Sequence, residues 1–116
     1  MSSYKELVVW QKSFSLALDV YRITGTFPDS ERFALQSQMR RAGVSIPSNI
    51  AEGSKRGTNK DFSSFLRIAH GSAAELETQL LLAKELHYIS EQHHKESEEK
   101  LSEVMKMLSA LLQSLH

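Results

Sequence analysis

Residues 45–57, which read SIPSNIAEGSKRG, concentrate side chains that could do chemistry. Asn49 and Glu52 lie here beside two basic residues, and a second carboxylate, Glu75, lies in the stretch HGSAAELE at residues 70–77. Catalysis by such carboxylates requires a nucleophile and a base close by, and the sequence offers no such pair. The segment EGSKRG also lacks the glycine spacing of a P-loop. We therefore predict no catalytic residue and no enzyme activity.

The histidines are the other candidates for chemistry, because imidazole is a common metal ligand. They are His70, His87, His93, His94 and His116. His94 and Glu98 have the i, i+4 spacing that could share a metal ion on a helix. No third ligand is in helical register with them, so we interpret the pair as part of a solvated polar face. The chain has no cysteine, which excludes disulfides and Cys-based zinc sites. We predict no metal and no cofactor.

Charge is segregated along the chain, although Lys plus Arg equals Asp plus Glu at fourteen each. Residues 32–67 carry a net charge of +5, and residues 75–103 carry −5. A basic surface can bind the phosphates of nucleic acid with salt-dependent affinity. The candidate nucleic-acid-binding residues are Arg40, Arg41, Lys55, Arg56, Lys60 and Arg67. The same polarity could instead pair neighbouring subunits head to tail in a ring. No aromatic platform interleaves with the basic residues, so nucleic acid is favoured only weakly.

Stretches of apolar residues at helical spacing predict the elements that position these groups. The first stretch covers about residues 5–24, and Gly25 and Pro28 end it. Its apolar stripe is Leu7, Trp10, Phe14, Ala17, Leu18 and Tyr21. The second begins near Asp29 or Ser30, which are both good N-caps. Its stripe is Leu35, Met39, Ala42, Ile46, Asn49, Ile50 and Gly53.

Two further helices are predicted in the second half of the chain. The third has Asn59 as its N-cap and ends at about Leu86 or Tyr88. Its stripe is Phe62, Phe65, Leu66, Ala69, Ala73, Leu76, Leu80 and Ala83. The fourth starts near Ser90, and its stripe is Leu101, Val104, Met105, Leu108, Leu111, Leu112 and Leu115. With short connections and no strand-like alternation, the sequence predicts an all-α fold, an antiparallel up-down-up-down four-helix bundle that forms a single domain over residues 1–116.

Pro47 lies inside the second stripe and leaves two interpretations. Proline in a helix interior costs about 3 kcal/mol, because it removes a hydrogen bond and clashes with the preceding turn. The apolar stripe nevertheless continues in phase across Pro47, which favours one continuous, kinked helix. The alternative is a helix that ends near Gly43 and a new one that has Ser45 as its N-cap.

Asn49 lies on the apolar stripe of the second helix and Glu52 lies at its edge. Gly71, in the third helix, costs about 1 kcal/mol relative to alanine, and close approach of the two helices is the expected reason for it. We predict a structural polar layer of Asn49, Glu52, Ser72 and Glu75, in which the Asn49 amide bonds to the third helix, because a buried amide needs partners. In the alternative, the two glutamates are solvated at the surface.

No stretch is apolar or long enough to span a bilayer or to serve as a signal peptide, so we predict a cytoplasmic protein with no membrane association.

The stretches YKELVVWQKSFSLALDVYRIT, LQSQMRRAGVSIPSNIAEGSKR and FLRIAHGSAAELETQLLLA resemble the four-helix-bundle family encoded by intervening sequences in bacterial 23S rRNA genes. The resemblance covers about residues 4–90 and extends to the accessory variability protein of diversity-generating retroelements. It implies a homopentameric ring with a basic surface suited to RNA or DNA, and it implies no enzymatic activity. Within this expectation, Met107 and either Leu111 or Leu112 are candidates to face a neighbouring subunit.

Two functional hypotheses follow for this non-enzymatic homo-oligomer. In the first, it binds nucleic acid through its basic surface. In the second, it is a protein-interaction scaffold whose segregated charges serve ring assembly alone, and its protein partner is unknown. Salt-dependent binding of RNA or DNA separates the two.

Overall fold

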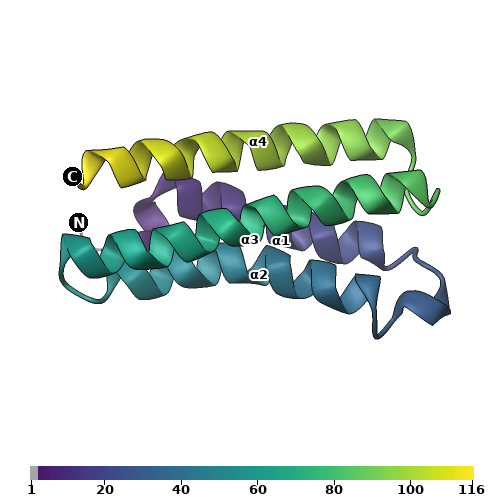
Figure 1. Cartoon of the computed structure of the whole chain (residues 1–116), viewed down its shortest axis with the longest axis horizontal. Helices are drawn as coiled ribbons and strands as arrows, with labels where there is room; N and C mark the ends of the chain where they lie inside the picture. The colour runs from purple at the N-terminus through teal and green to yellow at the C-terminus, as the bar shows by residue number, and fades with distance from the viewer. Residues whose placement is uncertain (1–2) are drawn as a thin grey trace.

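The structure of the protein is a computed structural model, which describes residues 3–116. Its long helices are α1 (Val8–Thr24), α2 (Leu35–Ser54), α3 (Asn59–Glu85) and α4 (Glu91–Ser114), and its short 3-10 turns are η1 (Tyr4–Glu6) and η2 (Asp29–Glu31). Successive helices run in opposite directions (Figure 1). No strand occurs in these residues, which confirms the predicted all-α four-helix bundle. No helix in residues 3–116 combines the length and apolar character that a membrane crossing needs.

The order in which the helices pack determines which of their faces can meet. Helix α2 packs against α1 and α3, and α4 packs against α3 and α1. Helices α2 and α4 therefore lie diagonally opposite each other in the bundle. The basic α2 and the more acidic α4 consequently face opposite sides of the molecule.

Helix α2 starts at Leu35 and not at Asp29 or Ser30, so the predicted start was wrong. Pro28 opens the separate turn η2, in which its carbonyl accepts a hydrogen bond from the Glu31 backbone N–H at 2.9 Å. The Glu31 carboxylate then accepts from the Leu35 backbone N–H at 3.3 Å and from the Tyr88 hydroxyl at 2.7 Å. One carboxylate thus caps α2 and ties its start to the connection between α3 and α4. The hydrogen bond to Glu31 raises the pKa of Tyr88.

The ends of α3 and α4 follow ordinary capping chemistry. Thr58, and not the predicted Asn59, is the N-cap of α3, and its hydroxyl accepts from the Asp61 backbone N–H at 3.1 Å. Helix α3 ends at Glu85, slightly before the predicted end, because the chain turns at His87 with a φ of 62°. Ser90 caps α4 as its sequence position suggested.

Helix α2 runs through Pro47 without a break, so the alternative of two shorter helices was wrong. The proline removes one backbone hydrogen bond at a cost of about 3 kcal/mol. Met39, Ile46 and Ile50, which flank it on the same stripe, are fully buried. Burial of each side chain contributes about 1.5–3 kcal/mol, so the packing of α2 outweighs the cost of its proline.

Helix α1 buries a different face from the predicted one. Its buried side chains are Val9, Ser13, Leu16, Ala17, Asp19, Val20 and Thr24. Phe14, Leu18 and Tyr21, which were predicted to be buried, are about half exposed, whereas Leu7 and Trp10 pack partly buried against the core. Helix α1 meets α2 at Gly43, where an added Cβ would lie 3.5 Å from the Val20 side chain, an ordinary van der Waals distance. The face of α1 that contains Val20 is therefore turned toward α2, and the larger side chains of Phe14, Leu18 and Tyr21 lie beside this contact.

The other predicted stripes agree with the structure. Helix α3 buries Leu66, Ala69, Ala73, Leu76, Leu80 and Ala83, and α4 buries Leu101, Val104 and Leu108. Met107, Leu111 and Leu112, which were candidates for a subunit contact, are partly buried against the core of their own bundle.

The close approach of α2 and α3 depends on Gly53, and the assignment of this role to Gly71 was wrong. A Cβ on Gly53 would lie 2.6 Å from the Phe65 Cβ and 3.1 Å from Phe62 Cδ1. A Cβ on Gly71 would have no atom within 4 Å. The two helical glycines therefore have opposite consequences for stability.

We predict that Gly53→Ala lowers the free energy of unfolding by about 1–3 kcal/mol, because the new methyl overpacks the crossing. Gly71→Ala, its matched control, should raise it by about 0.5–1 kcal/mol, because alanine favours the helix at an open position. Urea denaturation at fixed protein concentration measures both. Two changes of the same sign would contradict this account of the crossing.

Candidate nucleic-acid interface

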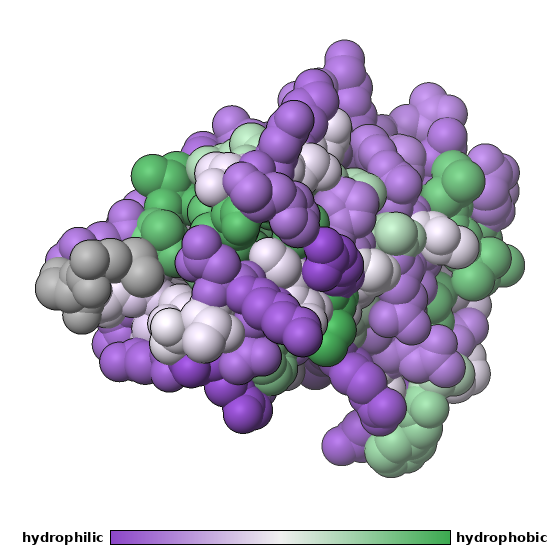
Figure 2. Space-filling model, turned by 60° about the vertical axis from the view of Figure 1, so that its left-hand side comes forward, coloured by the Kyte–Doolittle hydropathy of each residue, from purple (hydrophilic) through white to green (hydrophobic). Residues whose placement is uncertain are grey.

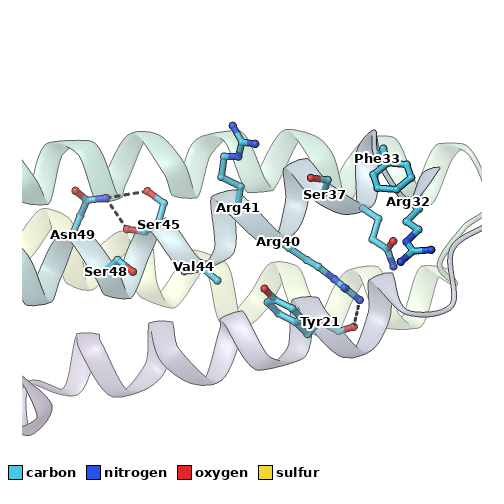
Figure 3. Close-up of a pocket in the computed structure, with 11 residues that line it drawn as sticks. Tyr21, Arg32, Phe33, Ser37, Arg40, Arg41, Val44, Ser45, Ser48 and Asn49 are labelled. Atoms are coloured by element: carbon cyan, nitrogen blue, oxygen red, sulfur yellow. Dashed lines mark hydrogen bonds between the residues drawn. The ribbon is translucent and has the colours of Figure 1, made fainter. Parts of the chain in front are cut away.

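A groove of about 700 Å³ lies on the outer side of α2, next to α1. Its walls come from α2, from the turn before it and from Tyr21 of α1 (Figure 3). Three of the eleven lining residues are Arg32, Arg40 and Arg41, and none is Asp or Glu. Three positive charges in a groove that no carboxylate lines create a positive potential in a concave site, which favours an anionic ligand.

Arg40 holds α2 against the end of α1. Its Nε donates to the Thr24 hydroxyl at 2.9 Å, and its Nη2 donates to the Tyr21 carbonyl at 3.3 Å. Its guanidinium lies 4.5 Å from the centre of the Tyr21 ring. Because these contacts fix the side chain, Arg40 contributes charge to the groove while its donors serve the fold.

Arg41 and Arg32 have their donors available. The Arg41 side chain makes no hydrogen bond or ion pair within residues 3–116, and it leaves α2 on the side away from α1 (Figure 3). Arg32 lies over the neighbouring Phe33 ring, 5.4 Å from its centre. A guanidinium presents a planar fork of N–H donors that matches phosphate oxygens. These two arginines are therefore the best placed to bind phosphate.

The other predicted basic residues lie elsewhere. Lys55, Arg56 and Lys60 lie in or next to the turn between α2 and α3, where Arg56 pairs with Glu52 at 2.7 Å and lies 4.9 Å from the Phe65 ring centre. Figure 2 brings this end of the bundle forward and shows mainly hydrophilic residues with smaller hydrophobic areas between them. Lys55 is fourteen positions from Arg41 on a helix that rises 1.5 Å per residue, so about 21 Å separates these two residues, and Asn49 at the near end of the groove is six positions from Lys55.

Arg67 belongs to neither group, since its guanidinium lies 3.4 Å from the His116 Nε2 at the end of the chain. The six predicted nucleic-acid-binding residues therefore occupy three places on the surface. The groove and the turn share the exposed side of α2, whose single carboxylate, Glu52, is already paired.

The polar contacts of Asn49 differ from the predicted layer. Its Nδ2 donates within α2, to the Ser45 carbonyl at 2.8 Å and to the Ser45 hydroxyl at 2.9 Å. The Ser45 hydroxyl in turn bonds to the Ser72 hydroxyl of α3 at 2.7 Å. Asn49 thus reaches α3 through Ser45, while Glu52 and Glu75 are exposed and take no part. A side chain four residues earlier on the same helix was the nearer partner, and the sequence argument had not considered it.

Helix α4 carries the acidic side of the bundle. Its carboxylates are Glu91, Glu96, Glu98, Glu99 and Glu103. Glu103 pairs with Lys12 of α1 at 2.9 Å, and Lys100 bonds to the buried Asp19, which also binds Arg22. These contacts join α1 to α4. The +5 segment thus covers α2 and the first turns of α3, and the −5 segment covers the rest of α3 and the first half of α4, the helix diagonally opposite α2.

Three aromatic rings lie beside arginines, and the sequence had not predicted these contacts. Tyr21, Phe33 and Phe65 each lie within 5.4 Å of a guanidinium carbon, measured to the ring centre. Arg32 and Phe33 are adjacent in the sequence, and that pair was a usable signal. The other two pairs join different helices or a turn to a helix, so they are visible in the folded chain alone.

The profile of the family described as "23S rRNA-intervening sequence protein" matches residues 5–110, nearly the whole chain. The chain belongs to this family. It is also similar to a crystal structure of a protein of unknown function from the S23 ribosomal protein family of Bacteroides thetaiotaomicron, with 27% sequence identity and a TM-score of 0.85. That similarity covers 91% of this chain and 96% of the other. None of the curated proteins matches the sequence.

A second titratable group lies between α3 and α4 in this member of the 23S rRNA-intervening sequence protein family. Partial burial raises the pKa of Glu98, and a hydrogen bond with Glu77 and the repulsion between the two carboxylates raise it further. The Nε2 of His94, one turn away, is buried without a hydrogen-bond partner. Within residues 3–116, no group of three or more His, Cys, Asp or Glu side chains is placed to hold a metal ion. We therefore interpret the Glu98–Glu77 pair as part of the contact between α3 and α4.

A carboxyl group whose pKa is raised by folding stabilises the fold while it is protonated, and this stabilisation is lost as the pH rises through the raised pKa. We therefore predict that Glu98→Gln, which stays neutral and can still bond to Glu77, is more stable than the natural chain at pH 7. The difference should shrink as the pH falls toward about 4, the ordinary range of glutamate.

The control is Glu99→Gln, an exposed position on the same helix. Urea denaturation between neutral pH and about pH 4 measures both variants. A Glu98→Gln variant that is less stable than the natural chain at pH 7 would contradict the raised pKa of Glu98 and its hydrogen bond with Glu77.

Proposed function

We propose that this chain is a cytoplasmic, non-catalytic, oligomeric protein that binds RNA or DNA through the groove on α2. The observation that supports it is the groove wall, which holds Arg32, Arg40 and Arg41 and no carboxylate. Surface charges on a small neutral protein are ordinarily mixed in sign, as they are on α4. A concave, acid-free arginine surface is suited to a polyanion, because each phosphate that it neutralises releases counterions.

The basic turn between α2 and α3 extends the same surface. The side chains of Lys55 and Lys60 make no hydrogen bond or ion pair in residues 3–116. A chain of phosphates that runs along α2 from Arg41 would reach Lys55 after about 21 Å, the length of helix between these two residues. These lysines would add affinity without selecting a sequence, because they bind phosphate as point charges.

Exposed apolar side chains support the oligomeric part of the proposal. Outside the groove these are Val8, Phe14 and Leu18 on α1 and Ile68, Leu81 and Leu82 on α3, with Leu86 at its C-cap. Phe14 and Leu18 lie one turn apart on one face of α1, and exposed apolar surface of this kind commonly marks contact with another chain. A homopentamer, which the family resemblance suggested, is the proposed assembly. The same side chains keep the second candidate open, a scaffold in which the basic side of one copy covers the acidic side of the next.

The prediction that separates the two candidates is a salt titration of binding to labelled RNA and DNA. If the groove binds phosphate, the logarithm of the affinity should fall linearly with the logarithm of the salt concentration. Arg41→Ala should lower that slope by about 0.7 for a single strand or about 0.9 for a duplex, the value of one phosphate contact. Lys106→Ala, which removes the same charge from exposed α4, should leave the slope unchanged.

Sedimentation equilibrium fixes the oligomeric state of each variant in the same buffers. A monomer at micromolar concentration would refute the oligomeric part of the proposal. The absence of RNA and DNA binding even at low salt, together with an assembly that Arg41→Ala disrupts, would reject nucleic-acid binding in favour of the scaffold.

A further inference from the structure

Phe33 is the most exposed large apolar side chain in the described chain. It is 88% exposed and lines the groove that holds the three arginines. The ring contacts the Arg32 guanidinium, whose carbon lies 5.4 Å from the ring centre. Arg32 is itself exposed at the surface. The fold gains almost nothing from this ring, because it buries little area. A ring that contributes so little to the core is available to a ligand.

Tyr21 supplies a second ring at the α1 side of the same groove. Its side chain is about half exposed, and Arg40 lies 4.5 Å from the ring centre. Figure 3 shows Tyr21 and Phe33 at separate points of the groove, each near an arginine. The groove therefore presents both chemistries that single strands require: guanidinium groups for phosphates and π-faces for bases.

We propose that the groove binds single-stranded nucleic acid, with a base stacked on Phe33 and neighbouring phosphates held by Arg32 and Arg41. This inference rests on the proposed function and narrows its ligand. In a duplex the base faces are covered by their neighbours and base edges alone are accessible, so an exposed ring gains nothing from double-stranded nucleic acid. In a single strand each unstacked base offers a face, and its phosphates remain available to the arginines.

The dimensions and the remaining polar groups of the groove suit a short strand. From Ser37 to Asn49 the wall extends for about 18 Å along α2, which at about 3.4 Å per nucleotide corresponds to about five nucleotides. The hydroxyls of Ser37 and Ser48 make no hydrogen bond within the described chain, so they can bond to phosphate or base edges. Stacking tolerates every base, so this site would bind with little sequence preference.

The experiment measures fluorescence anisotropy with oligouridylate of about ten nucleotides, an RNA hairpin duplex with the same number of phosphates, and an abasic strand of the same length. We expect the base-containing single strand to bind more tightly than either of the others. Phe33→Ala should weaken its binding about 5- to 150-fold, the range of one base–aromatic stack, and should leave the salt slope unchanged. Phe33→Trp should retain the binding.

The abasic strand isolates the stacking contact, because it retains the phosphates and lacks the base. Phe33→Ala should not weaken its binding further, whereas Arg41→Ala should weaken both strands. Gln113→Ala shortens an exposed polar side chain at the end of α4, outside the groove and outside the exposed apolar side chains, and should change nothing.

Equal affinity for single strand and duplex, with no effect of Phe33→Ala, would overturn this inference and leave the proposed function intact. If none of the three probes binds at low salt, the proposed function falls together with the inference. If Phe33→Ala instead changes the sedimentation of the free protein, the ring contacts a second copy of this chain, and the single-strand site is rejected.

Discussion

The rotation of α2 about its own axis is the constraint on which the rest of the structure depends. Five apolar side chains fix it, all at most 8% exposed: Leu35, Met39, Ala42, Ile46 and Ile50. With this stripe in the core, Gly43 and Pro47 are buried on the side of α1, and Gly53 meets the phenylalanines of α3. Arg41 and Ser48 must then face outward. The same packing that stabilises the bundle thus places the arginines at the surface.

The arginine groove is maintained at some electrostatic cost. Like charges on one face repel each other, and no carboxylate lines the groove to offset them. Arg40 reduces that cost, because it donates hydrogen bonds to Thr24 and Tyr21, and its charge lies over a ring. By contrast, the charges between α1 and α4 are paired, as in Lys12–Glu103. The bundle therefore has one side where charges are neutralised and one side where they are left available, as a phosphate-binding surface requires.

The helices were predictable because a single period governs each of them. Helix α3 buries six of the eight residues of its predicted stripe, while Phe62 and Phe65 are half-buried at its start. Helix α1 is apolar on two sides, so its period alone could not say whether Phe14 or Leu16 faces the core. That choice depends on how α1 packs against the other helices, for example Val20 and Ala17 against Gly43 of α2. The hydrogen-bond partners of polar side chains were harder still to predict. Asn49 bonds to Ser45, one turn away on its own helix, and not to a group across the bundle. The basic segment, residues 32–67, could be identified from its charge alone. The positions of the Tyr21 and Phe65 rings beside arginines depend on the folded structure.

We propose that the exposed groove between Tyr21 and Phe33 is the nucleic-acid-binding surface of this family member. Photocrosslinking tests it most directly: a single strand that carries 4-thiouridine is irradiated in complex with the natural protein, and the modified peptides are located by mass spectrometry. The account predicts crosslinks in the peptides that contain Tyr21 and Phe33, lost in competition with an unlabelled single strand. Crosslinks confined to α4, or to α3 around Leu82, would contradict it.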